Sequence, residues 1–143
     1  MAHFKLSELP EQKESERQRD IKTVINEKRS LMVRCKLLSD LIPNEFVKDM
    51  KEMKEDKLNE INRLLIGIST NLSNIGGFCD KRTREKISSL KRFLSVVMIT
   101  PMGYIQLKSL LPIISGLEVN FNKRPFKIIN FSIPGFINTK FER

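Results

Sequence analysis

A dense group of basic residues lies just past the middle of the chain. Six cations fall within twelve positions, with Asp80 and Glu85 as the only acids beside them: Lys81, Arg82, Arg84, Lys86, Lys91 and Arg92. On a helix these cations would span several phosphates of a duplex, because each residue adds about 1.5 Å. Each cation that neutralises a phosphate releases counterions, which is typical of salt-sensitive binding to a nucleic-acid backbone. The alternative is a solvated helix surface, which charge runs commonly form.

A second basic group lies near the C-terminus, in a segment that reads as a turn. It consists of Lys123, Arg124 and Lys127. Phe121 and Phe126 flank the turn and could stack on unpaired bases. The same two phenylalanines also fit an ordinary hydrophobic core, and the three cations an exposed turn. As a binding site, the three cations could flank the same ligand as the first group or enter a groove.

The distribution of charge separates the two parts of the chain. The net charge is +9, yet residues 1–60 hold thirteen basic and thirteen acidic side chains and are neutral. The remaining residues hold thirteen basic side chains and only Asp80, Glu85, Glu118 and Glu142 as acids. Such asymmetry indicates a second part that faces a polyanion. An acidic protein partner is the alternative to nucleic acid.

The sequence contains no residue pattern that is typical of a catalytic site. The single histidine, His3, lies at the third position, so no Ser-His-acid or Cys-His arrangement can be argued. No cysteine or histidine cluster with zinc-ligand spacing, no phosphate-binding loop and no dinucleotide fingerprint occurs. The acids between Glu45 and Glu60 fit a solvated helix face. We therefore expect a protein that is not an enzyme and that needs no metal and no cofactor.

Cysteine usage and hydropathy bear on the compartment. Cys35 and Cys79 are too few for a disulfide framework, although they could form a single bridge, and this favours a reduced, intracellular setting, cytoplasmic or nuclear. The longest apolar stretch, residues 93–111, is interrupted by Thr100-Pro101 and Gly103, so it is not a membrane span. Binding of a basic amphipathic helix to a membrane surface is a weaker alternative.

The spacing of apolar residues predicts helices that would position the basic groups. The first runs from about Pro10 to Leu41, and Pro43-Asn44 then breaks the chain. The second runs from about Asn44 to Leu72, so residues 21–72 predict an antiparallel helical hairpin. Residues 11–20 have no apolar face. The segment 1–20 therefore contains either solvated first turns or a flexible segment. Gly76-Gly77 marks a stop and a hinge.

The rest of the chain divides into a basic helical segment and a hairpin. Residues 80–111 contain a third helix that Asp80 caps and that ends before Pro101, followed by a short helix over 103–111 that stops at Pro112. Residues 116–135 alternate in hydropathy around a turn, which predicts a β-hairpin. We expect a single domain over 1–143, mainly α, although an α+β arrangement is left open.

Together these patterns predict a non-catalytic protein that binds RNA or DNA through the phosphate backbone. The helical hairpin would serve self-association, as a homodimer, or would hold a helical protein partner. Met32, Met50 and Met53 suit such adaptable interfaces. The alternative is a helical interaction or scaffold subunit of a larger complex. No motif is specific enough to indicate a family, although a composition rich in lysine, isoleucine and asparagine would fit a viral protein.

Overall fold

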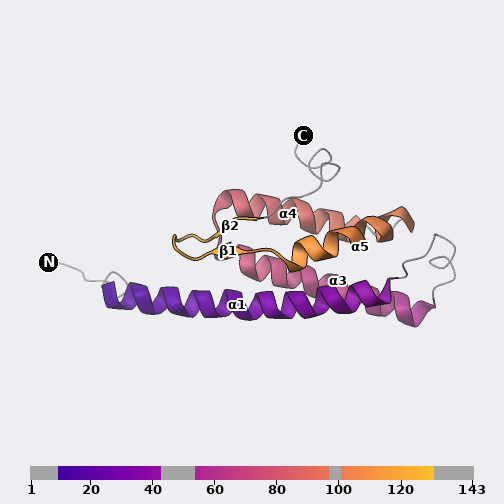
Figure 1. Ribbon diagram of the computed structural model, residues 1–143, viewed down its shortest axis with the longest axis horizontal. Coiled ribbons are helices and arrows are strands. Elements are labelled where there is room, and N and C mark those ends of the chain that lie inside the picture. Colours follow the sequence, from indigo (N-terminus) through magenta and orange to yellow (C-terminus); the bar gives the residue numbers. More distant parts are fainter. Residues whose placement is uncertain (1–9, 43–53, 97–100, 131–143) are drawn as a thin grey trace.

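The computed structural model describes residues 10–42, 54–96 and 101–130, and these form a mainly helical fold with one small hairpin (Figure 1). The helices are α1 (Pro10–Leu41), α3 (Glu55–Gly76), α4 (Lys81–Val96) and α5 (Pro101–Ser115), and the strands are β1 (Val119–Asn120) and β2 (Lys127–Ile128). The predicted fold class is therefore confirmed. The expected start of the second helix near Asn44, together with His3, Met50 and Met53, lies outside the described residues.

Helix α1 is the longest element, and α3 packs along it in the antiparallel direction, as the helical hairpin predicts. Polar contacts fix their register. Arg34 Nη1 donates to Asn71 Oδ1 at 2.7 Å and to the Gly67 carbonyl oxygen at 3.2 Å. Asn71 Nδ2 donates in turn to Glu27 Oε1 at 2.8 Å. A Cβ at position 67 would lie 2.6 Å from Arg34 Nε, so glycine leaves the room that this guanidinium occupies.

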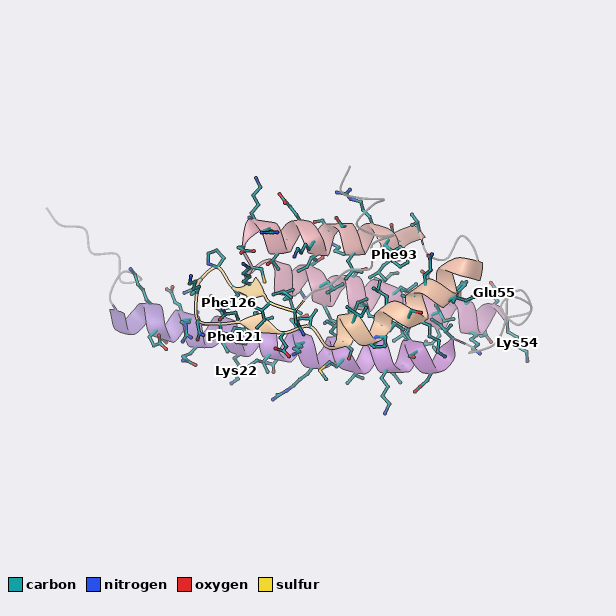
Figure 2. All side chains as sticks on the ribbon, turned by 45° about the horizontal axis from the view of Figure 1, so that its top comes forward. Lys22, Lys54, Glu55, Phe93, Phe121 and Phe126 are labelled. Atoms are coloured by element: carbon teal, nitrogen blue, oxygen red, sulfur yellow. The ribbon has the colours of Figure 1, made fainter. Side chains whose placement is uncertain are left out.

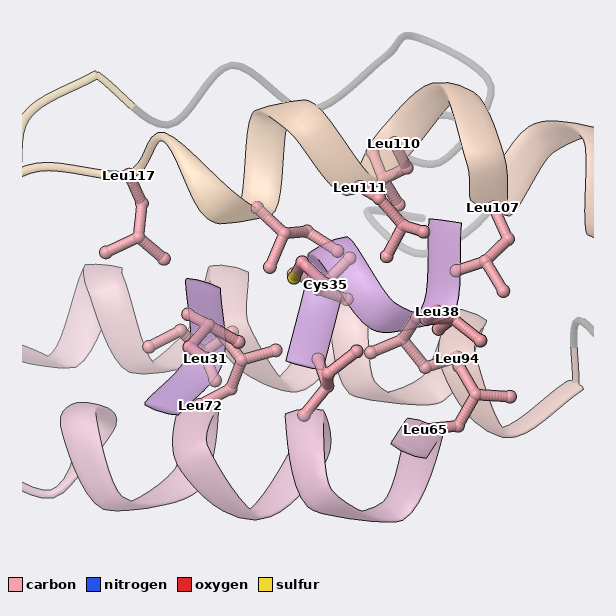
Figure 3. Close-up of a cluster of buried hydrophobic side chains, with 14 of the residues drawn as sticks. Leu31, Cys35, Leu38, Leu65, Leu72, Leu94, Leu107, Leu110, Leu111 and Leu117 are labelled. Carbon is pink, nitrogen blue, oxygen red and sulfur yellow. The ribbon is translucent and has the colours of Figure 1, made fainter. Parts of the chain in front are cut away.

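The hydrophobic core lies between α1, α3, α4 and α5 (Figure 3). Helix α4 packs on α3, and α5 packs on α1. Leu31 and Leu38 of α1, Leu72 of α3 and Leu107 and Leu111 of α5 are almost completely buried. The i, i+3, i+4 and i+7 spacing of the apolar residues explains this arrangement, because it gives each helix one continuous apolar face.

Helix α5 is longer than the sequence predicted. We expected a short helix that stops before Pro112, but α5 begins at Pro101, continues through Pro112 and ends at Ser115. A proline inside a helix removes one backbone donor and costs about 3 kcal/mol. Continuing the helix buries Ile114 completely, and burying one such side chain contributes about 1.5–3 kcal/mol. Pro112 itself is exposed, so its ring lies on the solvent side.

The ends of two helices have clear chemical causes. The second predicted helix was expected to stop near Leu72, but α3 continues to Gly76, because Ile75 is completely buried against the core. Gly76 also lets α4 approach, since a Cβ there would meet Ile87 Cδ1 at 3.3 Å. At the end of α1, Lys108 Nζ donates to the Ile42 carbonyl oxygen at 2.6 Å. A cation there is favoured by the helix dipole.

The β-hairpin is present but short. Val119 pairs with Ile128 and Asn120 pairs with Lys127 in an antiparallel ladder. The expected hairpin over 116–135 extends beyond the described residues at its C-terminal end. Two-residue strands are too short to be stable in water by themselves. The hairpin is instead held by its contacts with α1 and with the start of α4.

Candidate nucleic-acid interface

Helix α4 carries one apolar and one cationic face. Thr83, Ile87, Leu90 and Leu94 are buried. The six basic residues lie elsewhere on the helix, with Lys81, Arg82, Arg84 and Arg92 exposed and Lys86 and Lys91 half-buried at the two margins of the apolar face. None of the six forms an ion pair with another described residue. No carboxylate of the described residues therefore holds any of the six in an ion pair.

The second basic group lies beside the first residues of α4, because the hairpin docks there. Phe126 forms an isolated parallel bridge with Cys79. The amide of Asp80 donates to the Phe126 carbonyl oxygen at 2.8 Å, and the amide of Phe126 donates to the Phe78 carbonyl oxygen at 2.9 Å. Lys123, Arg124 and Lys127 are all exposed. We call these three residues and the six of α4 the basic surface.

Asp80 caps α4, as the sequence predicted. Its Oδ1 accepts a hydrogen bond from the Thr83 amide at 2.8 Å. Hydrogen bonds from Thr83 hold the pKa of the Asp80 carboxyl below its ordinary value, and the nearby charges of Lys127 and Arg82 lower it further. The carboxylate therefore already occupies a backbone donor of the helix start. That amide is therefore not available to an anionic ligand.

The two basic groups meet at a pocket beside the start of α4. Its volume is about 420 Å³, and it is lined by Asp20, Gly77, Phe78, Cys79, Arg84, Arg124 and Pro125. We call it the arginine pocket. Arg84 comes from α4 and Arg124 from the hairpin loop, so the pocket joins residues that are distant in sequence. Gly77, the residue after the end of α3, contributes to the same wall. No glycine of the described chain has a positive φ, so Gly76 and Gly77 do not form the alternating backbone of a phosphate-binding nest.

Two residues of α1 that sequence reasoning missed complete the site. Asp20 forms an ion pair with Arg124 across 104 positions of sequence. Arg17 donates from Nε and Nη2 to the Phe121 carbonyl oxygen, at 3.2 and 2.9 Å. Residues 10–20 lie within α1, and Arg17 and Asp20 among them contact the hairpin loop. The dense charge of this segment is the only sequence feature that sets Arg17 and Asp20 apart, and it does not indicate that they contact the hairpin.

The two phenylalanines of the hairpin belong to the core. Phe126 is 1% exposed, and its ring centroid lies 5.0 Å from that of half-buried Phe121 in an edge-to-face arrangement (Figure 2). The core interpretation therefore explains their positions, and Phe126 cannot reach a base without unfolding of the hairpin. Edge-to-face packing adds about 0.5–1.5 kcal/mol to the stability that burial supplies.

The remaining cations extend the basic surface along α4. Arg92 lies two turns beyond Arg84, about 12 Å away along the helix axis. Lys91 borders a groove of about 450 Å³ between α3 and α4, together with Ser69, Thr70 and Ser73. The structure therefore brings Arg84 and Arg124 into one pocket, while Lys91 and Arg92 lie farther along the same helix.

The comparisons with known proteins name no relative. The sequence matches no family model, and it has no significant similarity to a curated protein or to a solved structure. Among the described residues, no helix combines the length and the apolar sequence that crossing a bilayer requires. The function must therefore be argued from the geometry of this chain itself.

Proposed function

We propose that this protein binds nucleic acid through the phosphate backbone, using the basic surface of α4 and the hairpin loop. The observation that carries the proposal is the arginine pocket, where Arg84 and Arg124 converge although they are far apart in sequence. A solvated charge run does not require a second basic segment to lie beside it. The docking of the hairpin on α4 brings the two segments together through backbone hydrogen bonds.

The electrostatics of the surface favour a polyanion. Eight of its nine cations form no ion pair with another described residue, and the ninth, Arg124, pairs with Asp20. Unpaired cations that neutralise phosphates release counterions, so the binding constant should fall steeply with salt. Base-edge recognition has no comparable support, because the aromatic side chains of the hairpin are packed in the core.

The experiment that tests this function is fluorescence anisotropy with labelled single-stranded and double-stranded RNA and DNA, at low and moderate salt. The triple variant Arg84→Ala, Lys91→Ala, Arg92→Ala should bind more weakly and with a smaller salt slope, without unfolding. A matched variant, Arg29→Ala, Lys36→Ala, Lys54→Ala, removes three exposed cations from α1 and from the residue before α3. Equal binding by both variants would contradict the assignment of the surface, and no binding at low salt would contradict the function.

A second function, association with another helix, is supported by an exposed apolar pair on α1. Val33 and Leu37 lie one turn apart on the solvent side of α1 and are 59% and 49% exposed. In an antiparallel pair of two α1 helices, with Val33 of one copy opposite Leu37 of the other, Arg29 comes within one residue of Asp40. This complementarity favours a second copy of the chain as the partner. Sedimentation velocity of wild type and of Val33→Asp, Leu37→Asp tests it, since a dimer should dissociate in the variant.

Membrane binding through α4 has less support than nucleic-acid binding or self-association. A peripheral helix inserts its apolar face between lipids. The apolar face of α4 is packed in the core, with Leu90 and Leu94 buried. Lipid contact through that face would therefore require α4 to leave the fold.

A further inference from the structure

The arginine pocket differs in shape and chemistry from the rest of the basic surface. Arg84 and Arg124 come from different elements and line one concavity of about 420 Å³, whereas Lys91 borders the separate groove between α3 and α4. That volume lies within the range of small-molecule binding sites, about 300–1,000 Å³. Apolar and backbone groups of Gly77, Phe78 and Pro125 form part of the same lining. The pocket therefore combines an anion-binding wall with an apolar one.

The pocket already contains an anion, the carboxylate of Asp20. Asp20 Oδ2 accepts a hydrogen bond from Arg124 Nη2, and the Asp20 side chain is less exposed than that of Arg124. Carboxylate and phosphate oxygens are alternative acceptors for the planar guanidinium group. Arg84, the other cation of the pocket, has no ion pair with a described residue. An incoming phosphate would thus find one open arginine and one that carries a replaceable acceptor.

We propose that the arginine pocket takes one nucleotide of a single-stranded nucleic acid, with its phosphate on Arg84 and Arg124 in place of the Asp20 carboxylate. This inference rests on the proposed function and adds a preference for the single strand. In a duplex each base is paired and stacked inside the helix, so it cannot enter a pocket. An unpaired nucleotide can turn its base or sugar toward Phe78 and Pro125 while its phosphate remains on the arginines.

Asp20 is then an internal competitor for Arg124. A phosphate that binds must displace the Asp20 carboxylate from the Arg124 guanidinium. The displaced negative charge stays close to the phosphate and repels it. Neutralising Asp20 should therefore tighten binding, whereas the loss of a merely structural contact would weaken it or leave it unchanged. The direction of the change separates the two roles.

The test compares Asp20→Asn with Asp40→Asn. Both variants remove one negative charge from α1, but Asp40 lies twenty positions farther along, about 30 Å away and beyond the Debye length at physiological salt. Their dissociation constants are measured for labelled oligothymidylate and for the same strand paired with oligoadenylate. We expect Asp20→Asn to tighten single-strand binding about three- to tenfold. Asp40→Asn should change it less than about twofold, because its charge is screened. Equal effects of the two variants would overturn the inference, as would equal tightening on the duplex.

A second measurement does not depend on nucleic acid. The Nε–Hε signals of Arg84 and Arg124 can be assigned by NMR through Arg84→Lys and Arg124→Lys and followed during titration with inorganic phosphate, with sodium chloride of equal ionic strength as the control. Both signals should move, and Asp20→Asn should lower the phosphate concentration required. If they move while oligonucleotides do not bind, the proposed function fails and the phosphate site remains. If neither moves, the pocket is not a phosphate site, even where the rest of the basic surface binds nucleic acid.

Discussion

The amide of Asp80 donates a 2.8 Å hydrogen bond to the carbonyl oxygen of Phe126, and this contact ties the start of α4 to the hairpin. The same Asp80 caps α4 through its side chain, so one residue orients both basic segments. The place of Arg124 in the same pocket lining as Arg84 follows from this docking.

Phe126 anchors the hairpin in the core. Replacing a buried phenylalanine by alanine removes apolar contacts and leaves a cavity, so Phe126→Ala should lower the free energy of unfolding by about 3–5 kcal/mol. The matched variant Phe121→Ala should cost less, because Phe121 is only half-buried. Urea unfolding followed by far-ultraviolet circular dichroism measures both, since the chain has no tryptophan. A smaller loss for Phe126→Ala than for Phe121→Ala would contradict the packing described.

Asn71 connects α1 and α3 from a nearly buried position, with 3% of its surface exposed. It accepts from Arg34 and donates to Glu27, so Asn71→Ala leaves two charged groups without their shared partner. We expect a loss of about 1–3 kcal/mol in the free energy of unfolding. Asn74→Ala is the control, because Asn74 is exposed and makes one longer bond to the same Glu27. Equal losses would show that the burial of Asn71 is unimportant.

Asp80 should make stability depend on acidic pH. Its pKa in the folded protein lies below the ordinary value of 3.8. A lowered pKa means that its contribution is present above the ordinary value and is lost as pH falls through the folded value. Asp80→Ala should therefore cost about 1 kcal/mol near neutral pH, where the cap is charged, and progressively less in acid. Asp80→Asn keeps an acceptor at the same position and should lose less. A constant difference between wild type and Asp80→Ala down to strongly acidic pH would refute this role.

How much of this the sequence could predict depends on the range of the interactions. The limits of α1 follow from local proline signals, Pro10 in the first turn and Pro43 beyond the end, and they agree with the structure at Pro10 and Leu41. The cap of α4 by Asp80 is also a local interaction, between residues three positions apart. Helix α5 was predicted too short, because proline rules describe the local backbone and omit the burial of Ile114 by tertiary packing.

The arginine pocket could not be predicted, because nothing local connects its parts. Asp20 and Arg124 are 104 positions apart, and their contact requires both the docking of the hairpin and the length of α1. The cations themselves were recognisable by composition, but composition does not tell which of them converge. The sequence left two interpretations of Phe121 and Phe126 open, and only their burial and mutual contact decide for the core.

Cys79 lies on the lining of the arginine pocket and Cys35 lies in the core, and both are buried. Burial raises the pKa of the Cys79 thiol to about 11 and that of Cys35 to about 12. Because the thiolate is the reactive form, both should react with a disulfide reagent at least about a hundredfold more slowly in the folded protein than in urea, at mildly alkaline pH, and Cys35 should be the slower of the two. Rapid labelling of Cys79 in the folded protein would contradict the closed packing behind the pocket.

The most direct test of the central claim is a double-mutant cycle on the salt dependence of single-strand binding, with Arg84→Ala, Arg124→Ala and the combined variant. If the two arginines hold the same phosphate, each single variant leaves one cation on that phosphate and should lower the salt slope by less than one, and the combined variant should lower it by about one rather than two. The coupling free energy should then be about 0.5–3 kcal/mol. Additive losses, or binding that neither variant changes, would contradict a shared site at the junction of α4 and the hairpin.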